Sequence, residues 1–138
     1  MAKRVLVVDD HAPTRALIRS VLDAEKGDRF EVIEAGSGTE CLKAADSKGP
    51  FDIILLDVTL PDMDGFEVCR ALRTVDQQVP IVFVTAKGGL SDHATGRAAG
   101  GDSYLVKPIA RASLRSIVGL FTRVPRKREA MKPGAAKT

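Results

Sequence analysis

Acidic and other polar residues stand directly after several apolar runs of this sequence. Asp9 and Asp10 follow the first run, and Asp57 follows a later one. Thr85 and Lys107 each end a further apolar run. If these runs are parallel strands of one sheet, their ends lie at the edge where such sheets bind ligands. Three carboxylates, a hydroxyl and an ammonium would then share one pocket, and the carboxylates would raise one another's pKa unless a cation compensates them.

A hard divalent cation is the natural compensation for clustered carboxylates. Mg²⁺ prefers oxygen ligands and is usually held by a few protein groups together with a phosphate, and Mn²⁺ accepts the same donors. Asp10 and Asp57 are suitable side-chain ligands, and Asp9 can bind directly or through water. The backbone carbonyl of Thr59 lies within reach just past Asp57. We therefore predict a metal site formed by these four residues.

Asp57 is also the candidate nucleophile. A carboxylate needs no deprotonation at neutral pH and can form an acyl phosphate. The cation and Lys107 would balance the charge on the oxygens of the transferred phosphoryl group, and the Thr85 hydroxyl would donate to one of them. The residue types at the strand ends thus predict phosphoryl transfer to Asp57.

Strand-like and helix-like segments alternate along the chain. Apolar or β-branched runs predict strands at residues 5–8, 31–35, 51–56, 80–84 and 102–106. Helical spacing of apolar residues, turn formers and capping residues predict helices from Pro13 past Leu22, from Ser37 or Gly38 to Asp46, and over 66–73, 91–99 and 110–121. This order is (βα)₅, which predicts an α/β fold: an open parallel sheet with helices on both faces.

Length and composition indicate one domain with a charged tail. The chain has 138 residues, of which 44% are hydrophobic, and no apolar run approaches the length of a membrane span or a secretory signal. We therefore expect a cytoplasmic protein. Cys41 and Cys69 belong to no metal-binding or redox motif, so we expect reduced, structural thiols.

The basic charge is confined to the end of the chain. Residues 123–138 hold six Lys or Arg against one Glu, a net charge of +5, so the other 122 residues sum to −2 within the total of +3. We expect a folded domain over 1–122 and a basic, disordered tail or linker over 123–138. The tail lacks interleaved aromatic residues and the chain shows no helix-turn-helix segment, which argues against nucleic-acid binding.

Four motifs carry a resemblance to a known family. They are VLVVDD ending at Asp10, ILLDVTLPDMDG ending at Gly65, VTA ending at Ala86, and GGDSYLVKP ending at Pro108. Together, in this order and at these strand ends, they resemble the receiver domains of bacterial response regulators over about residues 3–122. The resemblance implies a flavodoxin-like, doubly wound sheet with the strand order 2-1-3-4-5.

The resemblance also implies roles for individual residues. Asp57 would accept a phosphoryl group from a histidine kinase or a phosphotransfer protein, with Asp9 and Asp10 binding Mg²⁺. Thr85, followed by Ala86, would provide the switch hydroxyl, and Lys107 would contact the phosphate. Tyr104 matches the aromatic residue that turns inward when the threonine moves toward phosphate. The Lys107–Pro108 bond matches a cis peptide of the family.

Phosphorylation at Asp57 is expected to act by a population shift. The added negative charge would draw Thr85 inward and let Tyr104 follow. The surface of the helix at 91–99, the strand at 102–106 and the helix at 110–121 would then change its affinity for a downstream protein partner. We expect a signalling phosphoacceptor rather than an enzyme, and a monomer or a weak dimer formed through that surface.

Some of these residues also occur in proteins with other functions. A hydrolase of the haloacid-dehalogenase type needs a second acid where Thr59 stands, and a flavodoxin-like cofactor binder needs a phosphate loop where Asp9 and Asp10 stand. A phosphate-independent pseudo-receiver that acts as a scaffold remains the alternative. Tyr104 could simply pack in the core. Four further residues are expected to have no part in the site: Asp62 and Asp64 as turn and helix-cap residues, and His11 and His93 as surface histidines.

Overall fold

The computed structural model describes residues 2–123, and it contains five strands and five helices in strict alternation. In chain order they are β1 Lys3–Val8, α1 Ala12–Asp23, β2 Phe30–Ala35, α2 Gly38–Ser47, β3 Ile53–Leu56, α3 Gly65–Arg73, β4 Ile81–Thr85, α4 Leu90–Ala98, β5 Ser103–Val106 and α5 Arg111–Thr122. Each corresponds to an element predicted from the sequence. The basic tail predicted for 123–138 lies, apart from Arg123, outside the described residues.

The strands form one parallel sheet with the order β2-β1-β3-β4-β5. β1 is central to the site because it pairs with β2 on one side and with β3 on the other. The register aligns Val8 with Leu56, so the residues that follow β1 and β3 leave the sheet side by side. The predicted α/β fold, with helices on both faces and this strand order, is confirmed.

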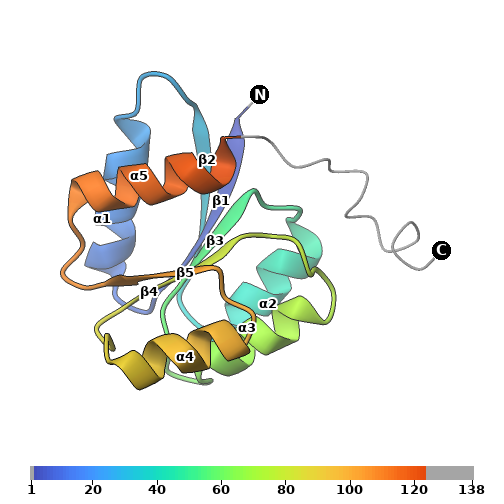
Figure 1. The fold of residues 1–138 in the computed structure, drawn as a ribbon. Coiled ribbons are helices and arrows are strands. Elements are labelled where there is room, and N and C mark those ends of the chain that lie inside the picture. The colour runs from blue at the N-terminus through green and yellow to red at the C-terminus, as the bar shows by residue number, and fades with distance from the viewer. Residues whose placement is uncertain (1, 124–138) are drawn as a thin grey trace.

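Helices cover both faces of the sheet, as Figure 1 shows: α1 and α5 lie on one face, and α2, α3 and α4 on the other. Each face has its own apolar core. Ile18, Leu22 and Leu114 belong to the first, and Phe66, Cys69 and Phe83 to the second. The strands between them are apolar on both sides because parallel sheets of this kind are covered on both faces.

Some boundaries differ from the sequence-based expectation for physical reasons. The apolar run at 51–56 is longer than β3, which begins at Ile53. Phe51 instead packs beneath the guanidinium of Arg4, with the Arg4 Cζ 4.9 Å from the ring centroid. Asp52 accepts a hydrogen bond from the Arg4 backbone N–H at 2.7 Å. Within the described residues, no helix is both long enough and apolar enough to span a membrane.

Candidate functional site

Two neighbouring strands deliver the buried carboxylates. The Asp9 backbone N–H donates to the carbonyl of Ala35 at 3.0 Å, so Asp9 continues the pairing of β1 with β2. The Asp57 N–H donates to the carbonyl of Val8 at 2.9 Å and extends the pairing of β3 with β1 in the same way. Backbone hydrogen bonds of the sheet therefore fix the position of both residues. Asp9 is 2% exposed and Asp57 is 5% exposed.

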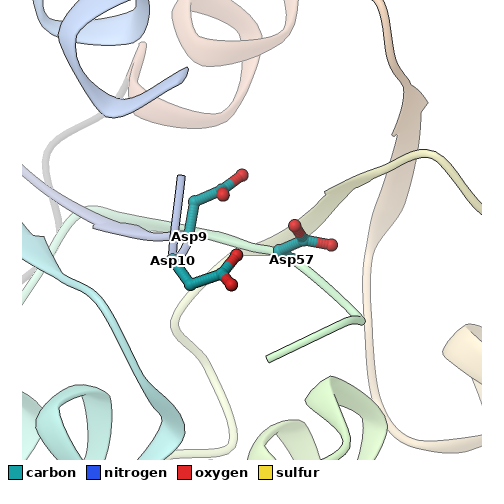
Figure 2. Close-up of side chains that lie close together, drawn as sticks. All are labelled: Asp9, Asp10 and Asp57. Carbon is teal, nitrogen blue, oxygen red and sulfur yellow. The ribbon is translucent and has the colours of Figure 1, made fainter. Parts of the chain in front are cut away.

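Asp9, Asp10 and Asp57 form an acidic cluster beyond the ends of β1 and β3 (Figure 2). One carboxylate oxygen from each residue lies within 4.8 Å of the others. Asp9 and Asp57 are buried, whereas Asp10 is exposed. All the donors are carboxylate oxygens, which are the ligands that hard divalent cations prefer. This donor set fits a magnesium-type ion, with the exposed side at Asp10 open to solvent.

Lys107 reaches the cluster from the opposite part of the sheet. Its backbone N–H donates to the carbonyl of Thr85 at 2.8 Å, which ties the end of β5 to the end of β4. Its ammonium donates to Asp9 Oδ2 at 2.6 Å and to Asp57 Oδ2 at 3.0 Å. The Lys107–Pro108 peptide bond is cis in the structure. Within the described residues, the Lys107 ammonium thus balances part of the negative charge of Asp9 and Asp57.

The electrostatics of the cluster are unfavourable to the charge on Asp9. Burial raises the pKa of the Asp9 carboxyl, and the charge of Asp57 raises it further, although hydrogen bonds from Lys107 and the His11 N–H oppose this. Burial by itself would lower the pKa of Lys107, but its hydrogen bonds to Asp9 and Asp57 raise it. A further positive charge between the carboxylates would therefore stabilise their ionised forms.

The loop after β3 is shaped around Asp57. The Thr59 N–H donates to Asp57 Oδ1 at 3.1 Å, and the Gly65 N–H donates to the carbonyl of Val58 at 2.7 Å. Gly65 leaves no room for a side chain, because a Cβ there would overlap the carbonyl oxygen of Asp57 and lie 2.6 Å from the Val58 Cα. The tight return of the chain holds Thr59 against Asp57. A role for the Thr59 carbonyl as a ligand stays a prediction.

Asp62 and Asp64 cap helices. Asp64 accepts from the Phe66 N–H at 2.8 Å at the start of its own helix, α3. Asp62 caps a different helix: it accepts from the N–H groups of Gly38 and Thr39 at 2.8 and 2.9 Å at the start of α2. Sequence reasoning identified the type of role but not this partner, which lies more than 20 positions earlier in the chain.

The predicted switch residues lie on β4 and β5. Thr85 ends β4 and is buried, with Ala86 exposed just beyond it. Tyr104 pairs with Phe83 in the register of β4 and β5, and the centroids of the two rings are 5.7 Å apart. The Tyr104 hydroxyl is buried, and none of the described residues gives it a hydrogen-bond partner. Tyr104 thus packs against the core, as the plainer interpretation expected.

Two contacts could not be predicted from the sequence, one at Asp9 and one at Tyr104. The Arg15 guanidinium, on α1, donates to the carbonyl of Asp9 at 2.6 Å. His93, expected to be a surface residue, is exposed, yet its ring stacks on that of Tyr104 with 4.2 Å between centroids and 25° between planes. No pattern in the sequence indicates either contact, because each depends on where a helix lies over the sheet.

Comparison with known proteins decides the family. The model of the response regulator receiver domain family matches residues 5–119. The chain belongs to this family. The receiver interpretation made from the motifs is thereby confirmed. The family is a signalling module of two-component systems, not a family of classical enzymes.

Individual relatives support the same assignment. The DNA-binding response regulator MtrA of Mycobacterium tuberculosis strain H37Rv is 43% identical over 108 residues, which cover 78% of this chain and 45% of that protein. The transcriptional regulatory protein PhoP of Bacillus subtilis, named for alkaline phosphatase synthesis, is 37% identical over 123 residues, covering 89% and 50%. The receiver chain therefore spans about half the length of the curated relatives it matches.

Solved structures share the fold. Chemotaxis protein CheY4 of Vibrio cholerae superposes with a TM-score of 0.80 at 32% identity, covering 88% of this chain and 99% of that one. A putative response regulator from Chloroflexus aurantiacus superposes with a TM-score of 0.81 at 30% identity, covering 90% and 100%. The acidic cluster therefore lies at the edge of a sheet whose fold is that of receiver domains.

Proposed function

We propose that this receiver domain is a phosphoacceptor whose Asp57 is phosphorylated in a Mg²⁺-dependent reaction, and that phosphorylation switches the binding of a downstream partner. The observation that carries the proposal is the acidic cluster of Asp9, Asp10 and Asp57, bridged by Lys107. The donor would be the phosphohistidine of a histidine kinase or of a phosphotransfer protein. An Asp57 carboxylate oxygen attacks phosphorus, the P–N bond breaks, and the histidine leaves with the electron pair.

Each residue of the site has a separate role in this phosphoryl transfer. Asp57 is the nucleophile, and the N–H of Thr59 holds its carboxylate in place. Asp9, Asp10, Asp57 and the Thr59 carbonyl would hold Mg²⁺, or Mn²⁺ in its place. When bound, the ion supplies positive charge to the oxygens of the phosphoryl group. Lys107 supplies a second positive charge, since its ammonium contacts two of the carboxylates.

The switch would run from Asp57 through β4 to the surface of α4, β5 and α5. Thr85 ends the strand next to β3, so its hydroxyl can donate to a phosphoryl oxygen, with Ala86 just beyond. Tyr104 would hold its inward position when Thr85 moves. Leu90 on α4 and Val106 on β5 are 88% and 45% exposed, which supports a protein-binding surface there.

The proposal extends to the bounds of the domain, its location and its oligomeric state. We propose a cytoplasmic domain over residues 1–122 with a linker or tail over 123–138, and a monomer or a weak dimer through the surface of α4, β5 and α5. The MtrA relative is named as a DNA-binding regulator, but this chain matches only 45% of its length. We propose that the described domain acts through protein contacts, and that nucleic acid is not its ligand.

The test is phosphorylation by acetyl phosphate, followed by intact-mass spectrometry with and without Mg²⁺. Wild type should gain one phosphoryl group only when Mg²⁺ is present, and Asp57→Asn should gain none. Asp46→Asn, an exposed carboxylate on α2, is the matched control and should behave as wild type. Absence of an adduct together with absence of Mg²⁺ binding would favour the alternative, a phosphate-independent pseudo-receiver that acts as a scaffold.

A further inference from the structure

A row of aromatic rings runs from the core to the surface beneath α4. Phe66 meets Phe83 edge to face with 5.1 Å between centroids, and Phe83 meets Tyr104 at 5.7 Å. The row ends with His93, which stacks on Tyr104 at 4.2 Å and 25°. Tyr104 is therefore held between a core ring on one side and an exposed ring of α4 on the other.

Ring contacts, not hydrogen bonds, hold Tyr104 in this position. Its hydroxyl is buried and has no partner within residues 2–123. A buried hydroxyl without a partner costs free energy, so the position needs compensation from packing. A cavity of about 190 Å³ adjoins the ring and is lined in part by Gly96 and Gly101, so the neighbouring side chains leave space beside it. His93 lines the same cavity, and its stacked ring is the contact that Tyr104 makes with α4 there.

We propose that His93 is a positioning residue for Tyr104: its stacked ring holds the tyrosine inward, and so links the position of α4 to the state of the switch. This inference rests on the proposed function, in which the inward ring is the arrangement that phosphorylation favours. His93 touches neither the phosphoacceptor nor its metal ligands. It acts only through Tyr104.

The expected size of the effect follows from the energy of an aromatic stack. Such a pair favours one of two ring positions by about two- to tenfold. Coupling between sites is reciprocal, so a variant that loses the stack should bind a phosphoryl mimic at Asp57 more weakly, by up to the same factor. The two effects can be measured separately.

The first experiment measures the ring itself. The chain contains one tyrosine and no tryptophan, so its tyrosine fluorescence reports on Tyr104 alone. Acrylamide quenching would be compared in wild type, His93→Ala, His93→Phe and Leu90→Ala. Leu90 is 88% exposed on the same helix, and its variant controls for general loosening of α4. His93→Ala should increase the accessible fraction of Tyr104, whereas His93→Phe, which restores a stacked ring, and Leu90→Ala should match wild type.

Each other result overturns the proposal. Unchanged quenching in His93→Ala means that the stack does not hold the ring. Increased quenching in His93→Phe means that stacking is not the interaction involved, and increased quenching in Leu90→Ala means that any change in α4 suffices. Circular dichroism of the four proteins would establish that all are folded, as expected for changes at exposed positions.

The second experiment measures the coupling. Beryllofluoride with Mg²⁺ would be titrated into each protein and followed by the amide NMR signals of residues 57–59. His93→Ala should bind more weakly than wild type, by up to about tenfold, with His93→Phe restoring the affinity. Equal affinities would overturn the coupling. If wild type itself binds no beryllofluoride and gains no phosphoryl adduct, the proposed function fails, while the quenching result still decides whether His93 holds Tyr104.

Discussion

The ammonium of Lys107 donates to the carboxylate of Asp9 at 2.6 Å, although the two residues are 98 positions apart in the chain. The same ammonium lies 3.0 Å from Asp57 Oδ2. Lys107 therefore occupies oxygens that a divalent cation would also use. Its positive charge competes with a bound cation for these two carboxylates, so it should weaken the binding of Mg²⁺.

We predict that Lys107→Ala binds Mg²⁺ about tenfold more tightly than wild type, because removal of a nearby positive charge strengthens the attraction of the carboxylates for the ion. The same variant should lose about 2 kcal/mol of unfolding free energy without Mg²⁺, since hydrogen bonds to two charged groups are gone. Calorimetric titration and urea unfolding would measure the two effects. Lys43→Ala, an exposed lysine on α2, is the control. Weaker Mg²⁺ binding would instead mean that Lys107 organises the carboxylates.

Asp9→Asn should stabilise the metal-free protein at neutral pH. Burial and the neighbouring Asp57 raise the pKa of Asp9, so its ionised form is destabilised in the folded state. Removing the charge should raise the unfolding free energy by about 1 kcal/mol while weakening Mg²⁺ binding, a trade of stability against function. Thermal unfolding with and without Mg²⁺ would test this, with the exposed Asp10→Asn as a comparison of smaller effect. Destabilisation of Asp9→Asn would show that its bond to Lys107 outweighs the burial.

Gly65→Ala should damage the phosphoacceptor loop. A Cβ at this position overlaps the Asp57 carbonyl, so backbone must move. We expect a loss of about 2 kcal/mol in unfolding free energy and slower phosphorylation by acetyl phosphate. Gly119→Ala is the matched control: nothing lies within 4 Å of its Cβ on α5, and the change should stabilise the helix by up to about 1 kcal/mol. Equal behaviour of the two variants would contradict the steric argument.

Glu34 should contribute stability that depends on pH. The hydrogen bond from Arg19, followed by that from Arg15, lowers the pKa of Glu34 below its ordinary value of 4.5. A lowered acid pKa adds stability that is fully present above the unfolded pKa and is lost as pH falls through the folded pKa. Because the pair is partly exposed, Glu34→Gln should cost only about 0.5 kcal/mol at neutral pH.

Urea unfolding at about pH 7 and about pH 3 would measure this difference between wild type and Glu34→Gln, which should shrink in acid. Glu25→Gln is a useful comparison. Glu25 Oε2 lies 3.9 Å from Arg115 Nε, so this ion pair should contribute less to the free energy of unfolding than the contacts of Glu34. A difference that persists in acid would mean that packing of the Glu34 side chain, not its charge, is responsible.

The fold class and the acidic cluster of the site could be predicted from local sequence alone. Alternating apolar runs and helical spacing predicted ten elements, because burial on both faces of a parallel sheet leaves a pattern that local sequence carries. The polar residues at the ends of four of the strands predicted the edge at which chemistry would occur. Asp9, Asp10 and Asp57 were identified in this way, since chain direction alone brings the ends of parallel strands to one edge.

The contacts between these side chains follow from the packing of the folded chain and could not be predicted from its sequence. Lys107 bonds to Asp9 and Asp57, Asp62 caps α2 rather than its own helix, and His93 covers Tyr104. Each contact joins elements that are separate in the chain, and its geometry depends on strand order and on where a helix lies over the sheet. Local periodicity carries no information about those placements, because they result from packing of the two cores as a whole.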